Sequence, residues 1–170
     1  MTFHSIVRNW CRIYEPMLDS VENGNRRFYL ADDTDGVRAM PKSIATKFSP
    51  CVVMENGAEG FLKDGLLTRN YAVYFFVRAD RQVDNDEQVV AYEEALYHAL
   101  QFYVWLKAKH DNDSPYGDYG SIDFERGFDV LPAGPLEDGW VAVLLQFERM
   151  ERINLCVQDD LYSGEVKSEE

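Results

Sequence analysis

The sequence lacks the cysteine spacing that would indicate a zinc site, a redox pair or a disulfide framework. Its three cysteines, Cys11, Cys51 and Cys156, stand far apart, and no two have the short spacing of a zinc knuckle or redox motif. An odd number also argues against a set of internal disulfides. Cys51 and Cys156 each lie in an apolar run, where small buried thiols are common. We therefore expect all three cysteines to be reduced and structural.

Motifs of nucleotide-binding and hydrolytic enzymes are also missing. There is no glycine-rich dinucleotide fingerprint, no P-loop, no G-x-S-x-G and no H-E-x-x-H. The histidines, His4, His98 and His110, are far apart, and His98 is predicted to be a polar residue on a helix surface. The acidic loops 32–36 and 110–118 lack the closing Glu of a calcium loop and read as turns. We expect no enzyme, no cofactor, no metal and no small-molecule substrate.

The chain has no apolar run of the ~20 residues that a membrane-spanning helix needs. The longest candidate, residues 89–106, is interrupted by two glutamates, a histidine and a glutamine. Residues 1–5 show no basic segment leading into an apolar one, as a secretory signal would. The sequence therefore predicts a cytoplasmic protein without a membrane partner.

Basic residues are few, with 17 Lys and Arg against 30 Asp and Glu, which gives a net charge of −13. This balance argues against direct binding to nucleic-acid backbones, which reward clustered Lys and Arg. It fits either simple solubility or a protein partner with a basic surface. The 170 residues, 46% of them apolar, suit a single domain over 1–170, with a frayed tail from about residue 163.

Hydrophobic periodicity predicts both helices and strands. Helices are expected over 3–18 and 86–109, with a helical turn over 43–48, and strands over 27–31, 51–55, 70–79, 122–130, 140–150 and 153–157. Residues 131–139 are expected to form a hairpin loop. The order is not the strict alternation of parallel α/β folds. We predict an α+β fold: a mixed or mainly antiparallel sheet with one long helix packed on a face and an N-terminal helix.

The strand over 70–79 is apolar on both sides of its pleat. One side carries Tyr71, Val73, Phe75 and Val77, and the other carries Ala72, Tyr74 and Phe76. A strand of this kind is either central in its sheet or has one face against a partner. Tyr74 and Phe76 are therefore candidate interface residues.

The long helix is apolar around more of its circumference than one sheet needs. Its predicted core face consists of Val89, Tyr92, Leu96, Ala99, Leu100, Tyr103 and Leu106. A second stripe holds Val90, Tyr97 and Val104 at seven-residue spacing, and Trp105 lies unexpectedly on the polar side. Either a loop or the first helix covers these residues, or they form a subunit interface. We take Val90, Tyr97, Val104 and Trp105 as further interface candidates.

The order and lengths of the elements resemble those of bacteriophage head–tail connector and tail-terminator proteins. The resemblance is carried by the strand 71–79, the helix 86–109 and the alternating run 140–147. It implies a non-enzymatic ring subunit that self-associates, caps a tail tube or joins it to the head, and is found in the virion.

Two alternatives remain open. The chain is an acidic interaction module, such as an inhibitor, an immunity protein or a nucleic-acid mimic, with carboxylates gathered on one face. The residues for such a face are Asp111, Asp113, Asp118, Asp123, Glu125 and Asp129. Or it is an enzyme whose site assembles from distant residues, with His98 or His110 facing acids of perturbed pKa in a cleft.

Overall fold

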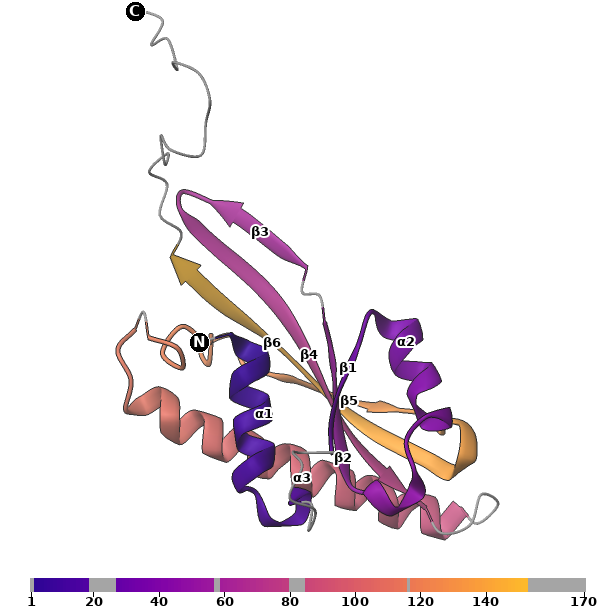
Figure 1. Cartoon of the computed structure of the whole chain (residues 1–170). Helices are drawn as coiled ribbons and strands as arrows, with labels where there is room; N and C mark the ends of the chain where they lie inside the picture. The colour runs from indigo at the N-terminus through magenta and orange to yellow at the C-terminus, as the bar shows by residue number, and fades with distance from the viewer. Residues whose placement is uncertain (1, 19–26, 57–58, 80–84, 116, 153–170) are drawn as a thin grey trace, which may run out of the picture.

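The computed structural model describes residues 2–18, 27–56, 59–79, 85–115 and 117–152. Within these residues six strands form one sheet in the order β1-β2-β4-β6-β5, with β3 paired to β4 (Figure 1). The strands are β1 (Phe28–Ala31), β2 (Cys51–Glu55), β3 (Gly60–Lys63), β4 (Leu66–Arg78), β5 (Asp129–Ala133) and β6 (Trp140–Arg152). β1 and β2 are parallel and every other pair is antiparallel. The predicted α+β fold with a mixed sheet is confirmed.

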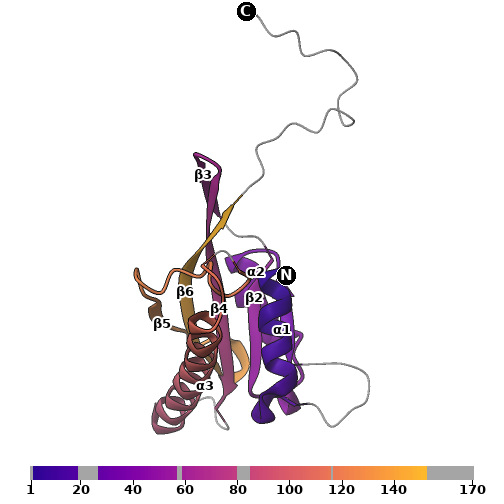
Figure 2. The same ribbon diagram turned by 90° about the vertical axis from the view of Figure 1, so that its left-hand side faces the viewer.

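Helices cover the two faces of this sheet unequally. The α-helices are α1 (Phe3–Ile13), α2 (Thr34–Ala39) and α3 (Asn85–Asp111), and short 3₁₀ turns occupy Glu15–Met17, Met40–Lys42, Thr46–Phe48 and Glu137–Gly139. α1 and α3 pack on one face, and α2 with the turns that follow it covers the other (Figures 1 and 2). The long helix on one face and the N-terminal helix are therefore both present. No helix in the described part of the chain is long and apolar enough to cross a membrane.

The central strand β4 is buried on both faces, as its composition predicted. Tyr71 and Phe75 belong to the core beneath α1 and α3, and Tyr74 and Phe76 belong to a second core on the α2 side. Tyr74 and Phe76 are 6% and 0% exposed. Both residues were predicted as interface candidates. That prediction is corrected here, because they lie in a core formed with residues of the segment 34–48 of the same chain.

α1 joins the sheet to α3. Thr2 caps its start by accepting a hydrogen bond from the backbone N–H of Ser5. The ring of Trp10 lies 5.9 Å from that of Phe75 in β4 and 5.1 Å from that of Phe102 in α3. The helix ends at Ile13 rather than at residue 18, because Pro16 falls in the 3₁₀ turn that follows. The end of α1 thus lies against the middle of α3.

The buried face of α3 matches the predicted one only in part: Ala99 and Leu106 are buried, and Tyr92 and Leu96 pack against the core. The buried face consists of Ala91, Ala95, His98, Ala99, Phe102 and Leu106, whereas Val89 and Leu100 of the predicted core stripe are exposed. Ala91, Ala95 and Ala99 lie on successive turns of this face, and Phe102 and Leu106 continue it toward the end of the helix. The prediction that His98 lies on the surface was wrong, because it shares this buried face.

Other differences come from local turn chemistry. The side chain of Asp33 accepts from the N–H of Gly36 and starts α2, where a loop was predicted. No strand spans 122–130: Ile122 makes one isolated bridge, and β5 begins only at Asp129. β5 therefore occupies part of the predicted hairpin loop. The predicted strand 153–157 and the tail from 163 lie outside the described residues.

The thiols agree with the sequence as far as the structure describes them. Cys11 and Cys51 are buried and neither forms a disulfide, and burial raises the pKa of Cys51. Cys156 is outside the described residues. Burial and a raised thiol pKa both disfavour the reactive thiolate, so these two cysteines are core residues.

Candidate interaction surfaces

The outer side of α3 carries an apolar stripe that the chain leaves uncovered. The exposed fractions are 66% for Val90, 56% for Tyr97, 44% for Leu100 and 59% for Val104. These four residues, called the α3 stripe below, recur at spacings of three, four and seven residues and so line one side of the helix. The stripe is about 21 Å long at 1.5 Å per residue.

Trp105 does not belong to the α3 stripe. It is half-buried and packs against the core. Its ring stacks on Phe102 at 6.1 Å and meets the edge of Tyr119 at 5.8 Å. Of the two explanations left open for the second stripe, a wider core therefore accounts for Trp105, whereas Val90, Tyr97 and Val104 stay exposed.

Carboxylates flank the first half of the α3 stripe. Asp86, Glu87, Glu93 and Glu94 all lie within the first ten residues of α3, where negative charge also suits the helix dipole. The cation Lys107 lies near the other end and forms an ion pair with Asp111. The stripe is therefore apolar along its length and acidic on the side of its N-terminal turns.

A second exposed apolar surface lies at the other end of the molecule. β3 and the ends of β4 and β6 that pair beside it project beyond the helices as a ribbon (Figures 1 and 2). The ribbon exposes Phe61 by 67%, Leu66 by 41% and Met150 by 43%. The turn at its tip has Asp64 and Gly65 at φ 49° and 77°, which suits a tight hairpin.

Strand register places these side chains on one face of the ribbon. In one row across the three strands, Thr68 lies between Phe61 and Met150. In the next row on the same face, Leu66 lies between Lys63 and Arg152. Neighbours in a row share a face, and residues two apart along a strand do too. These six residues, called the ribbon face below, lie on the α2 side of the sheet. They hold two cations and no carboxylate, in a chain of net charge −13.

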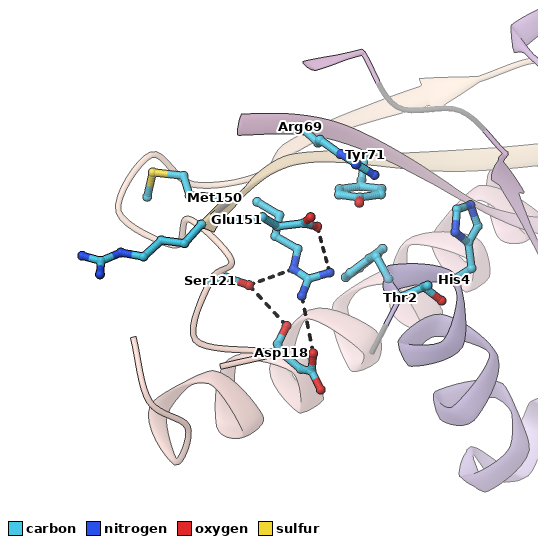
Figure 3. A pocket seen from close by; sticks show the side chains of 11 residues that line it. Thr2, His4, Arg69, Tyr71, Asp118, Ser121, Met150 and Glu151 are labelled. Atoms are coloured by element: carbon cyan, nitrogen blue, oxygen red, sulfur yellow. Dashed lines mark hydrogen bonds and ion pairs between the residues drawn. The ribbon is translucent and has the colours of Figure 1, made fainter. Parts of the chain in front are cut away.

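A pocket of about 780 Å³ lies at the base of the ribbon on the opposite face, with Arg149 among its lining residues. Arg149 is 6% exposed, and its Nε donates to Oγ of Ser121 at 2.8 Å. Its terminal nitrogens lie 3.7 Å from an oxygen of Asp118 and 3.2 Å from one of Glu151. Figure 3 shows these three partners around the guanidinium that they bind.

These contacts make Arg149 a structural residue. The N–H of Met150 also donates to the carbonyl of Ser121 at 2.7 Å. Loop 118–121 is therefore fixed to β6 where the ribbon leaves the body. The charge of Arg149 faces two carboxylates within the chain, so its position stabilises the ribbon base.

His98 lies between α1 and α3. Its Nδ1 is 2.8 Å from the hydroxyl of Tyr14, and its Nε2 is 3.6 Å from an oxygen of Glu94. Burial lowers the pKa of His98, with Glu94 opposing in part, and burial raises the pKa of Tyr14 to about 12. A protonated Tyr14 donating to a neutral imidazole fits both shifts. His110 lies three turns away along α3 against Phe124 and Asp111, so the structure does not bring the two histidines together.

Four of the six carboxylates considered for an acidic binding face, Asp111, Asp113, Asp118 and Asp123, have partners within the chain. Asp113 accepts from the N–H groups of Ser114, Tyr119 and Gly120, which lowers its pKa. Asp123 accepts from two backbone N–H groups in the same way. Asp111 pairs with Lys107 and Asp118 with Arg149. Asp129 and Glu125 are exposed. In the part of the chain that the structure describes, no three His, Cys, Asp or Glu side chains are grouped to hold a metal ion.

Neither the known protein families nor the curated proteins contain a match to this sequence. Functional inference therefore rests on the surfaces. Sequence reasoning identified three of the four α3 stripe residues as interface candidates and placed Leu100 in the core. It missed the ribbon face, although Asp64-Gly65 between two apolar runs is a recognisable hairpin signal.

Proposed function

We propose that this protein is a non-enzymatic structural subunit that acts by self-association. Its assembly is a ring of the kind formed by phage tail-terminator or connector proteins, acting in the virion or during its assembly in the cytoplasm. The observation that carries the proposal is the α3 stripe. A 27-residue helix packs one side on the sheet and exposes large apolar residues elsewhere, among them the four of the α3 stripe.

An exposed apolar stripe of this length is characteristic of a contact surface. Fully burying a Val, Leu or similar side chain contributes about 1.5–3 kcal/mol. The α3 stripe residues are partly buried already, so their association yields only part of that. Because association costs several kcal/mol of lost translational and rotational freedom, a stable assembly requires at least one further surface.

The fold is consistent with the resemblance seen in the sequence. A long strand buried on both faces, a long helix and a strand pair follow one another in β4, α3, β5 and β6. This order supports the comparison with tail-terminator and connector proteins, but it concerns architecture alone. The α3 stripe therefore carries the functional proposal.

Light scattering on a sizing column, over a range of protein concentrations, tests the proposal. The wild type should elute as a discrete assembly of several chains. Tyr97→Lys/Val104→Lys should shift the mass toward the monomer, because it places two cations on the stripe. Leu131→Lys is the matched control, since Leu131 is an exposed apolar residue of β5 and is not part of the stripe. A wild type that stays monomeric throughout would overturn the proposal.

A further inference from the structure

The α3 stripe and the ribbon face point away from opposite sides of the sheet. α3 packs on the face that holds Tyr71 and Phe75. The ribbon face continues the other face, which holds Ala72 and Tyr74, because Leu66 and Thr68 are an even number of residues from them along β4. One chain therefore cannot bring its own two surfaces together, and a contact between them requires two copies.

The ribbon face is not needed for the chain's own core. Phe61, Leu66 and Met150 project beyond both helical layers and remain exposed by two-fifths or more. Among the described strands β3 pairs with β4 alone, so its outer edge is also uncovered. Natural sheets usually protect such edges with charge or cover them. Large apolar side chains at this place indicate a contact surface.

Charge distinguishes the possible partners of the two surfaces. Lys63 and Arg152 lie on either side of Leu66 on the ribbon face. Contact between two ribbon faces would bring only cations together. The first half of the α3 stripe is instead flanked by carboxylates such as Glu93 and Glu94. Apolar surface and opposite charge thus match between the ribbon face and the α3 stripe, which favours this pairing over a like-with-like contact.

We propose that the ribbon face of one copy binds the α3 stripe of a second copy. Lys63 and Arg152 then lie beside the carboxylates of the first turns of α3. Each copy uses a different surface toward each of its two neighbours, and such a head-to-tail contact forms a ring when the rotation between successive copies closes and an open filament when it does not. The proposed ring requires the first case. This inference rests on the proposed self-association and specifies the two surfaces that produce it.

Two variants that each remove one surface provide the test. Phe61→Lys/Leu66→Lys places cations on the ribbon face, and Tyr97→Lys/Val104→Lys places cations on the α3 stripe, so the two altered surfaces repel each other. Each variant alone should be monomeric by light scattering. An equimolar mixture should form a one-to-one dimer and nothing larger, because only one intact ribbon face and one intact stripe remain between the two partners. Val130→Glu, at an exposed apolar position of β5, should assemble like the wild type.

A charge-only pair keeps the test decisive if a doubly substituted surface fails to fold. Lys63→Glu/Arg152→Glu and, separately, Glu93→Lys/Glu94→Lys should each weaken assembly by about tenfold or more. Mixing the two variants should restore assembly, because every contact between one variant and the other then joins surfaces of opposite charge. The pairing of ribbon face with α3 stripe is wrong if the wild type and all these variants assemble alike. It is also wrong if the wild type assembles but the mixture of the two surface variants stays monomeric. In either case the proposed self-association stands. If the wild type is monomeric, both proposals fail.

Discussion

The hydroxyl of Tyr14 lies 2.8 Å from Nδ1 of His98, and this contact joins the end of α1 to the buried face of α3. Both groups belong to a junction that includes the stacked rings of Trp10 and Tyr14, 4.4 Å apart. Tyr97 of the α3 stripe lies beside this junction, with its ring centroid 5.7 Å from that of His98, so the junction also fixes the orientation of the stripe.

Stability should fall as the pH decreases from about 7.5 to 5.5. Burial lowers the pKa of folded His98 below its ordinary value of 6.5, so the unfolded chain takes up the proton more readily. Its neutral form stabilises the fold above about pH 6.5, and this contribution is lost as the pH falls toward the lowered pKa. Urea unfolding at several pH values measures the slope. His98→Gln should flatten the pH dependence of the unfolding free energy, whereas His110→Gln should leave that dependence unchanged. A pH dependence in His98→Gln as steep as in the wild type would refute the assignment to His98.

Tyr14→Phe should lower the free energy of unfolding by about 1–2 kcal/mol. The substitution keeps the ring that stacks on Trp10 but leaves the buried Nδ1 of His98 without its donor. Urea denaturation at pH 7.5 measures the loss. Tyr103→Phe, which removes a hydroxyl from a half-buried tyrosine of α3 outside this junction, is the matched control. Equal effects in the two variants would mean that the Tyr14 contact contributes nothing specific.

Arg149→Met should cost about 2 kcal/mol or more, because it leaves two carboxylates and a hydroxyl at the ribbon base without their buried cation. Arg126→Met removes an exposed ion pair with Glu148 and should change stability by less than about 1 kcal/mol. Denaturant midpoints at one pH compare the two. A larger effect at Arg126 would contradict the structural role assigned to Arg149.

Gly65→Ala should destabilise the ribbon by about 1 kcal/mol, since Gly65 adopts φ 77°, a conformation that side chains with a Cβ disfavour. Gly36→Ala offers the contrast within the same chain. A Cβ there would make ordinary contacts at 3.4 and 3.5 Å in a helix, where Ala is favoured over Gly. The midpoint of thermal unfolding should therefore fall in Gly65→Ala and should rise or stay unchanged in Gly36→Ala. A neutral Gly65→Ala would argue against the tight turn.

Alternation and element length predicted the fold class well. In β4, for example, apolar residues on both sides of the pleat indicate that both faces are covered. The same reasoning was only partly right on α3: Ala99 and Leu106 are buried as predicted, but the larger Val89 and Leu100 are exposed. The size of the apolar side chains alone therefore does not identify the buried side of a helix. Small residues such as Ala91 and Ala95 also belong to the buried face, and the sequence of one helix does not show this.

Residues 122–130 show a second limit. Phe124 and Phe128 alternate as a strand would, yet they pack on Tyr103 of α3, with ring centroids 5.5 and 5.0 Å away. Two features break the strand between them. Asp123 accepts from the backbone of the next residues, and Gly127 has φ 85°. Turn chemistry of this kind outweighs alternation.

The candidate surfaces differ in how far the sequence revealed them. Val90, Tyr97 and Val104 were visible as a stripe, because a seven-residue repeat is a local property of one helix. The ribbon face was not, because it depends on the register of three strands and joins Phe61 to Met150, which are 89 positions apart along the chain. Only the folded sheet brings them together.

The mass of the wild-type protein in solution, measured by sedimentation velocity from low to high micromolar concentration, tests the central claim most directly. The account predicts one discrete species containing several chains, replaced by monomer in Tyr97→Lys/Val104→Lys. A monomer at every concentration, with the same mass in wild type and variant, would contradict it.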